Sequence, residues 1–194
     1  NVGDVKKALS DASKKVEATY FVPFVAHATM EPMNATAYVQ KDRCDIWAPT
    51  QIHTVTQIVA SEVSGVPKEK VSIHTTLLGC GLGRRGDPGF MIEAVIASKA
   101  VGKPVKVVWS REDDIKYDLY RAATCQRIQA GLDSQGSLIG WSHKVFCSSI
   151  LKFLNPDWMM DGIDSFSLWG IFDFPGSPGL SQTVYGFPNF YVEQ

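Results

Sequence analysis

A glycine-rich loop between an apolar strand and a helical run constrains this chain more than any other feature. Residues 71–76 are mostly β-branched, residues 77–89 form the loop, and residues 90–100 have helical periodicity. The loop glycines are Gly79, Gly81, Gly83, Gly86 and Gly89. Glycine has no Cβ atom and adopts positive φ readily, so this backbone can approach another molecule closely. Because the following helix start adds partial positive charge, the loop suits an anionic or metal-oxo group.

The rest of the chain predicts an α+β fold, with a mixed β-sheet, hairpins and packed helices, and one βαβ crossover at the glycine-rich loop. Asp4 and Thr50 are the expected N-caps of the first two helices, and Asp87 that of the third. Gly65 and Gly102 are placed to end the second and third helices. Strands are expected at residues 16–22, 34–40, 44–47, 71–78, 105–109, 126–132 and 138–148.

The 194 residues are expected to form one partial domain. Residues 1–150 read as a compact α+β part, and residues 151–194 as an aromatic segment rich in glycine and proline turns. This segment is too apolar for a disordered tail. Its aromatic residues are Trp158, Phe166, Trp169, Phe172, Phe174 and Phe190. We therefore expect residues 151–194 to pack on the compact part or on further chain.

Composition excludes several classes of protein. The net charge is −1 and no basic cluster is present, so nucleic-acid binding is not expected. No apolar run reaches the roughly 18 residues of a membrane span. The cysteines Cys44, Cys80, Cys125 and Cys147 form no C-x-x-C pair, so a zinc site is not expected. Of these, Cys80 stands out because it lies inside the glycine-rich loop.

Residue patterns alone leave the ligand of the loop open. Residues 81–86 fit G-x-G-x-x-G, and Glu112 or Asp113 follows the next strand, as in dinucleotide-binding folds. Against this interpretation, Arg84 and Arg85 crowd the backbone where a pyrophosphate would lie. A glycine turn without any ligand is a further alternative.

His27 and Glu31 raise a separate question, because they are four residues apart. Such a pair can share one helical face as metal ligands or as an acid–base pair. Pro32 argues against a helix through this stretch, so we favour a structural, hydrogen-bonded role for both.

Seven collinear stretches together resemble the large, molybdenum-binding subunit of the xanthine dehydrogenase/aldehyde oxidase family. The resemblance is closest to the isoquinoline 1-oxidoreductase β-subunit type. Bacterial members of this type are often called aldehyde dehydrogenases. It covers nearly the whole chain. The stretches are residues 17–20 (EATY), 27–34 (HATMEPMN), 47–51 (WAPTQ), 79–85 (GCGLGRR), 102–113 (GKPVKVVWSRED), 120–121 (YR) and 185–189 (YGFPN).

The resemblance implies that the loop contacts a molybdopterin cofactor through its backbone. Relatives usually have Gly-Gly-Gly-Phe-Gly, with Cys80 here in place of the second glycine and Leu82 in place of phenylalanine. The cofactor-binding residues implied by position are Gly79, Cys80, Gly81, Leu82, Gly83 and Arg84. The amides of Leu82 and Gly83 are the main candidates, and no aromatic platform for substrate is expected.

The resemblance also implies an enzyme that hydroxylates aldehydes or N-heterocycles with oxygen from water. The cofactor would be molybdopterin, expected as the cytosine dinucleotide, with iron–sulfur clusters on a partner subunit. The family's catalytic glutamate lies outside this chain, which reads as a fragment that needs the remainder of the large subunit. The isolated fragment is expected to be inactive. The cytoplasm is the default compartment, with export to the periplasm as an alternative. Two other functions stay open, a nucleotide-binding βαβ module and a non-catalytic interaction domain.

Overall fold

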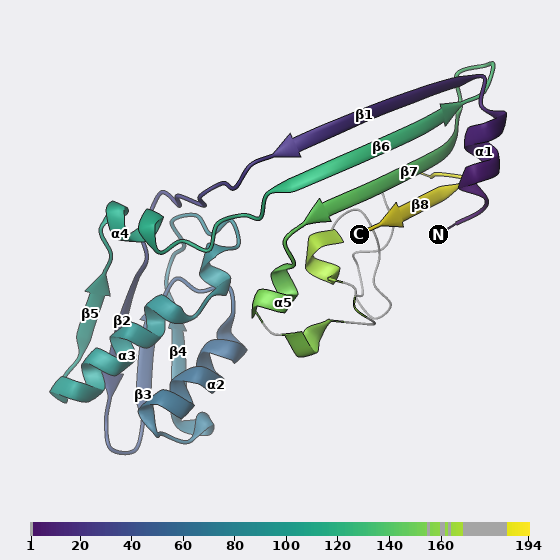
Figure 1. Ribbon diagram of the computed structural model, residues 1–194. Coiled ribbons are helices and arrows are strands. Elements are labelled where there is room, and N and C mark those ends of the chain that lie inside the picture. The colour runs from purple at the N-terminus through teal and green to yellow at the C-terminus, as the bar shows by residue number, and fades with distance from the viewer. Residues whose placement is uncertain (1, 155, 160–161, 163, 169–185) are drawn as a thin grey trace. The chain divides into compact units, whose positions relative to one another are not determined.

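The computed structural model describes residues 2–154, 156–159, 162, 164–168 and 186–194. By their internal contacts these residues form two compact units, residues 26–121 and residues 1–25 together with 122–194. Each contains a four-stranded sheet with helices, so the expected α+β class is confirmed (Figure 1). The expected boundary at residue 150 stays a prediction.

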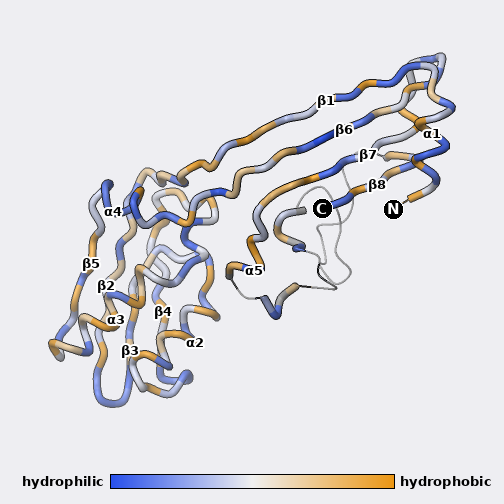
Figure 2. The backbone as a smooth tube through the Cα atoms, in the orientation of Figure 1, coloured by the Kyte–Doolittle hydropathy of each residue, from blue (hydrophilic) through white to orange (hydrophobic). Residues whose placement is uncertain are grey.

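The unit of residues 26–121 has the strand order β4-β3-β2-β5, with helices α2 and α3 on one face (Figure 1). Its elements are β2 (Asn34–Val39), β3 (Cys44–Ala48), α2 (His53–Ser64), β4 (Val71–Thr75), α3 (Gly89–Val101), β5 (Val105–Val108) and α4 (Arg111–Lys116), with 3-10 turns at Lys68–Lys70 and Arg84–Gly86. Strands β2 and β3 form the expected hairpin, and its turn is hydrophilic (Figure 2).

The connection through α3 explains how this sheet presents the glycine-rich loop. Strand β4 pairs in parallel with β3, β3 is antiparallel to β2, and β2 is antiparallel to β5. Strands β4 and β5 therefore run in the same direction but lie at opposite edges of the sheet. Helix α3 crosses the sheet between them, so the crossover expected at the loop is present but does not join neighbouring strands.

The core of this unit lies between the sheet and the two helices. Side chains from both sheet and helices are fully buried there, among them Met33, Ile46, Phe90, Met91 and Val95. Each such side chain contributes roughly 1.5 to 3 kcal/mol through removal of apolar surface from water. This packing fixes the positions of β4 and α3, the two elements that flank the loop.

The two N-caps expected in this unit, Thr50 and Asp87, are wrong by two residues and by one residue, respectively. Helix α2 begins after Ile52, and the Thr50 hydroxyl instead accepts a hydrogen bond from the Ile52 amide at 3.0 Å. Helix α3 begins after Pro88, because the Asp87 carboxylate is bound to the Arg84 side chain. The glycine ends are confirmed, since Gly65 and Gly102 both adopt the left-handed conformation.

Small and polar side chains occupy part of the buried faces of these two helices. Ile58 and Ile96 are exposed, while Thr56, Ala60 and Ala94 are buried. The buried Thr56 hydroxyl is satisfied, because it donates a hydrogen bond to the Ile52 carbonyl one turn earlier in the helix.

The second unit has the strand order β1-β6-β7-β8. Its elements are α1 (Val5–Asp11), β1 (Lys14–Val22), β6 (Thr124–Leu132), β7 (Leu138–Cys147), α5 (Ile150–Leu154) and β8 (Phe190–Glu193), with 3-10 turns at Pro156–Trp158 and Ser165–Leu168. The Asp4 cap and the β6–β7 hairpin are as expected. The two ends of the chain meet in this unit, where Val2 pairs with Phe190.

Part of the aromatic segment can be compared with its prediction. Phe190 is buried and stacks on Phe187, which in turn stacks on Trp141. Trp169, Phe172 and Phe174 lie outside the described residues. No helix in the described part of the chain is long and apolar enough to cross a bilayer.

Candidate functional site

The glycine-rich loop leaves β4 after Thr75 and reaches α3 through the 3-10 turn at Arg84–Gly86. Its backbone has φ values of +74° at Cys80, +51° at Leu82 and +95° at Gly83. The left-handed region costs a residue with a side chain about 1 to 2 kcal/mol. Strain of this kind persists only where surrounding contacts hold the backbone.

A row of unpaired N–H groups lies at the centre of the loop. Within the described part of the chain, the amides of Cys80, Gly81, Leu82 and Gly83 donate to no other group. The φ angle is positive at Cys80 and Leu82 but not at Gly81. Successive amides of alternating handedness form a concave nest, which is a typical binding site for an anion. Gly81 is buried as a residue, so its free N–H is an unusual feature that a ligand would explain.

Glu31 holds the first end of the loop. Its Oε2 atom accepts from the Gly79 amide at 3.0 Å and from the Arg85 guanidinium at 3.0 Å, and its own amide donates to the Gly79 carbonyl. A Cβ atom at Gly79 would lie 2.4 Å from the Glu31 Cβ, so only glycine fits there. Glu31 and His27 are not paired with each other, because His27 binds Asp118 at 2.9 Å. The structural interpretation of both residues therefore agrees with these contacts.

The two arginines of the loop are buried beneath it. Arg85 donates from Nε to the Cys80 carbonyl at 3.0 Å and lies over the Phe90 ring. Burial lowers the pKa of the Arg85 guanidinium, while the Glu31 carboxylate acts in the opposite direction. The Nη1 atom of Arg85 is buried and has no hydrogen-bond partner among the described residues.

Gln51 lies at the loop although no sequence pattern predicted a role for it. A Cβ atom at Gly81 would lie 2.7 Å from the Gln51 Oε1 atom, so the amide group of Gln51 lies against the loop. Its backbone amide donates to the Arg85 carbonyl at 3.1 Å. The side chain is exposed and makes no hydrogen bond within the described residues. Only its place in the stretch WAPTQ could have drawn attention to it.

Apolar side chains next to the loop are unusually exposed. Leu77, Leu78 and Leu82 belong to the loop, and Met30 precedes the Glu31 contact. Large exposed apolar side chains grouped in this way mark a surface for a ligand or for further protein.

The structure does not support Glu112 or Asp113 as the ribose-binding acid of a dinucleotide fold. Asp113 makes a capping box with Ser110 at the start of α4, and Asp114 is buried against Arg111. No group of three metal-ligating side chains is present in the described residues. Strand β5, which follows α3, lies at the opposite edge of the sheet from β4. In a dinucleotide-binding βαβ unit the two parallel strands are close together in the sheet.

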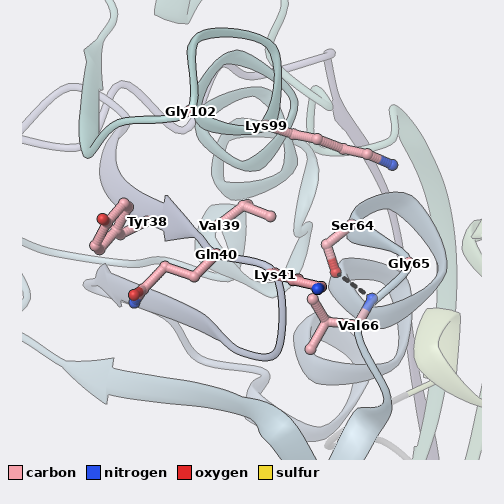
Figure 3. A pocket seen from close by; sticks show the side chains of 9 residues that line it. All are labelled: Tyr38, Val39, Gln40, Lys41, Ser64, Gly65, Val66, Lys99 and Gly102. Carbon is pink, nitrogen blue, oxygen red and sulfur yellow. Dashed lines mark hydrogen bonds between the residues drawn. The ribbon is translucent and has the colours of Figure 1, made fainter.

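A shallow hollow of about 530 Å³ lies at the opposite end of the same unit (Figure 3). Tyr38, Lys41, Gly65 and Gly102 are among the residues that line it. The hollow lies where the end of β2 pairs with the start of β3. Because β3 and β4 are parallel, the glycine-rich loop, which follows the end of β4, lies at the other end of the sheet. Lys99 at this hollow donates to the Val63 carbonyl at the end of α2, so its charge serves the helix end.

A loop with unpaired amides between a strand and a helix, set on this α+β scaffold, is typical of domains that bind an anionic ligand. The chain belongs to the molybdopterin cofactor-binding domain family, whose sequence profile matches residues 1–150. The resemblance to molybdenum-binding large subunits is thereby confirmed.

Individual relatives agree with this assignment. The chain is 37% identical to isoquinoline 1-oxidoreductase subunit beta of Brevundimonas diminuta over 136 residues, which is 69% of this chain and 17% of the relative. It is 30% identical to the aldehyde oxidoreductase molybdenum-binding subunit PaoC of Escherichia coli K12, covering 77% of this chain and 21% of the relative. This chain therefore spans about a fifth of the length of these relatives.

Solved structures show the same fold. The aldehyde oxidoreductase of Desulfovibrio gigas matches with a TM-score of 0.66 at 18% identity, over 75% of this chain and 16% of that protein. The CO dehydrogenase of Oligotropha carboxidovorans matches with a TM-score of 0.63 at 21% identity, over 74% of this chain and 19% of that protein.

Proposed function

We propose that this chain is the part of a molybdenum hydroxylase large subunit that binds the molybdenum cofactor through the loop of residues 79–84. The observation that carries the proposal is the row of four unpaired amides at residues 80–83. Fixed N–H donors favour a group that carries negative charge on oxygen or sulfur. The cofactor-binding residues are Gly79, Cys80, Gly81, Leu82, Gly83 and Arg84, and the amides of Leu82 and Gly83 are the main donors.

The contributions of these residues differ. The amides of residues 80–83 would bind the cofactor, and the exposed Gln51 amide beside Gly81 would add a side-chain donor. The space beside Gly83 is open to a ligand, because a Cβ atom built there would meet no atom within 4 Å. Gly79 serves by its contact with Glu31. When bound, the molybdenum centre supplies the oxidative hydroxylation chemistry.

The whole enzyme would act on aldehydes or N-heterocycles and transfer electrons to iron–sulfur clusters on a partner subunit. The substrate classes follow from the names of two relatives, an isoquinoline 1-oxidoreductase subunit and an aldehyde oxidoreductase subunit. The iron–sulfur partner is inferred from the family resemblance alone. We further propose the cytosine dinucleotide form of the pterin, and the cytoplasm as the default compartment with the periplasm as the alternative. A catalytic glutamate would come from the remainder of the large subunit, so the isolated chain would not catalyse.

Molybdenum content tests the proposal most directly. The full-length subunit, produced with an iron–sulfur partner, is expected to contain one molybdenum per chain by elemental analysis. Gly83→Ala should lower this content, because a side chain at φ +95° distorts the main donor. Gly86→Ala is the matched control, since its φ is not positive and its Cβ would meet no neighbour within 4 Å.

Absence of molybdenum from the unsubstituted subunit, under conditions in which a relative loads fully, would refute the proposal. The exposed apolar group formed by Met30, Leu77, Leu78 and Leu82 would then favour a non-catalytic interaction domain. Binding of NAD or ATP instead of molybdenum would favour the nucleotide-binding alternative.

A further inference from the structure

Arg84 belongs to the loop, yet its side chain is directed into the protein. The side chain is 1% exposed, and its guanidinium lies 5.5 Å from the centre of the Trp109 ring. Its Nη1 atom donates to Asp87 at 3.1 Å. Its backbone amide donates to the Gly81 carbonyl at 2.8 Å and closes the turn that follows the free amides. A bound cofactor would therefore not meet the charged end of this side chain.

Asp118 is the buried counter-charge of Arg84. Its carboxylate is 2% exposed, and its Oδ1 atom lies 3.1 Å from Arg84 Nε. This contact pairs the charges without aligning a hydrogen bond, because Nε has no hydrogen-bond partner. A carboxylate shielded from water interacts strongly with an adjacent guanidinium.

His27 fixes the orientation of the same carboxylate. Its backbone amide donates to Asp118 Oδ2 at 2.5 Å, and its Nδ1 atom lies 2.9 Å from Oδ1. A carboxylate only accepts hydrogen bonds, so Nδ1 carries the proton in this contact. Three segments that are far apart in the sequence thus meet at Asp118.

The loop is consequently held at both ends by carboxylates. Glu31 binds Gly79 at the first end and Arg85 at the second, where Asp118 binds the neighbouring Arg84. The amides of residues 80–83, between these ends, are unpaired in the described part of the chain, and Cys80 and Leu82 have strained positive φ values. Such a backbone needs restraint from outside the loop.

We propose that Asp118 is a positioning residue that, through Arg84 and oriented by His27, holds the amides of residues 80–83 in the arrangement that binds the cofactor. Arg84 then acts on the ligand only through the loop backbone. That Asp118 holds the loop backbone through Arg84 concerns this chain alone. That the held amides bind the cofactor rests on the function proposed above.

Hydrogen exchange of the Arg84 and Gly86 amides in the purified full-length subunit reports the restraint. Both amides are bonded within the loop, to Gly81 and Gly83, so their exchange requires the turn to open. Asp118→Asn should accelerate exchange at both by about tenfold or more, because it removes the buried carboxylate beside Arg84 and leaves only the more exposed Asp87 as its counter-charge. Amides of helix α3 should change much less.

Asp45→Asn is the matched control. Asp45 also contacts one histidine and one arginine in the same unit, His74 at 3.1 Å and Arg43 at 3.4 Å, but it lies in β3. This variant should leave the exchange of the Arg84 amide within about twofold of the wild type. If Asp118→Asn does not fold, His27→Gln provides the same test, with an expected acceleration of about threefold because the pair with Arg84 remains.

A double variant distinguishes positioning from general destabilisation. Arg84→Gln with Asp118→Asn should show loop exchange within about twofold of the more affected single variant, since both changes remove one shared contact. Additive effects, uniform acceleration throughout the unit, or no acceleration at Arg84 would each overturn the proposal. Molybdenum content should fall in Asp118→Asn and remain in Asp45→Asn. A wild type without molybdenum would refute the proposed function while leaving the exchange comparison valid.

Discussion

Replacement of Glu31 is expected to destabilise the loop-bearing unit more than any exposed ion pair would. Arg85 is completely buried and Glu31 is its nearest carboxylate, at 3.0 Å, while the Glu31 side chain is 37% exposed. Removing one partner of a fully buried pair costs about 3 to 5 kcal/mol. Because water can reach the Glu31 side of this pair, we expect about 2 kcal/mol for Glu31→Ala. Glu31→Gln should cost about 1 kcal/mol, since an amide oxygen can still accept from one of the two donors.

The assay is urea denaturation in which unfolding is detected by hydrogen exchange of peptides from residues 26–121. This readout reports the stability of the loop-bearing unit without a contribution from the other unit. With an m-value of about 1 to 3 kcal/mol/M in urea, a loss of about 2 kcal/mol corresponds to a decrease in the urea midpoint of roughly 0.7 to 2 M. Glu17→Ala serves as the control, because Glu17 forms an exposed pair with Arg127 in the other unit and should leave the transition almost unchanged. A Glu31→Ala variant as stable as this control would refute the inference that Glu31 holds the loop.

Three further predictions concern single positions. Gly79→Ala should destabilise the unit by about 2 kcal/mol or more, because the added Cβ atom would collide with Glu31. Gly86→Ala should be tolerated, because its Cβ atom would meet no neighbour. Thermal unfolding compares the two variants, and equal Tm values would contradict the close approach of Glu31 to Gly79. Cys80→Gly should raise stability by up to about 1 kcal/mol, because it relieves a φ of +74° while it adds freedom to the unfolded chain; a large loss in urea denaturation would show that the thiol makes essential contacts. Burial raises the pKa of the Cys44 thiol to about 11, above its value in the unfolded chain, so its contribution is complete below about pH 9 and is lost as the pH rises from about 9 to 11. This loss amounts to about 2 to 3 kcal/mol, and it should disappear in Cys44→Ala when the two proteins are unfolded in urea across that pH range.

Local patterns in the sequence predicted most of the secondary structure. The hairpins β2–β3 and β6–β7 follow alternation of polar and apolar residues, and helices α2 and α3 end at glycines that adopt positive φ. Two of the three expected N-caps, Thr50 and Asp87, were wrong because each side chain is engaged by a residue two or three positions away, and only Asp4 caps its helix as expected. Asp87, for example, is bound to Arg84 and is not available to cap α3.

The candidate site was only partly predictable. The glycine pattern and the family resemblance identified residues 79–84, and the place of those residues in cofactor binding stays a prediction. Periodicity gave no sign that Asp118 or Gln51 would lie at the loop, because each comes from a segment remote in sequence. The separation of Glu31 from His27 also depends on contacts over long sequence distances, with Gly79 and with Asp118.

The order of the two units along the chain has a consequence for modularity. Residues 26–121 depart after β1 and return before β6, and these two strands are neighbours whose facing ends, Val22 and Thr124, are directly paired. A chain joined directly across this gap would still form an ordinary antiparallel hairpin. The loop-bearing segment is thus placed like a cassette that recombination could insert, remove or exchange while the host sheet keeps its strand order. Production of residues 26–121 as a separate polypeptide is the natural first step in testing that autonomy.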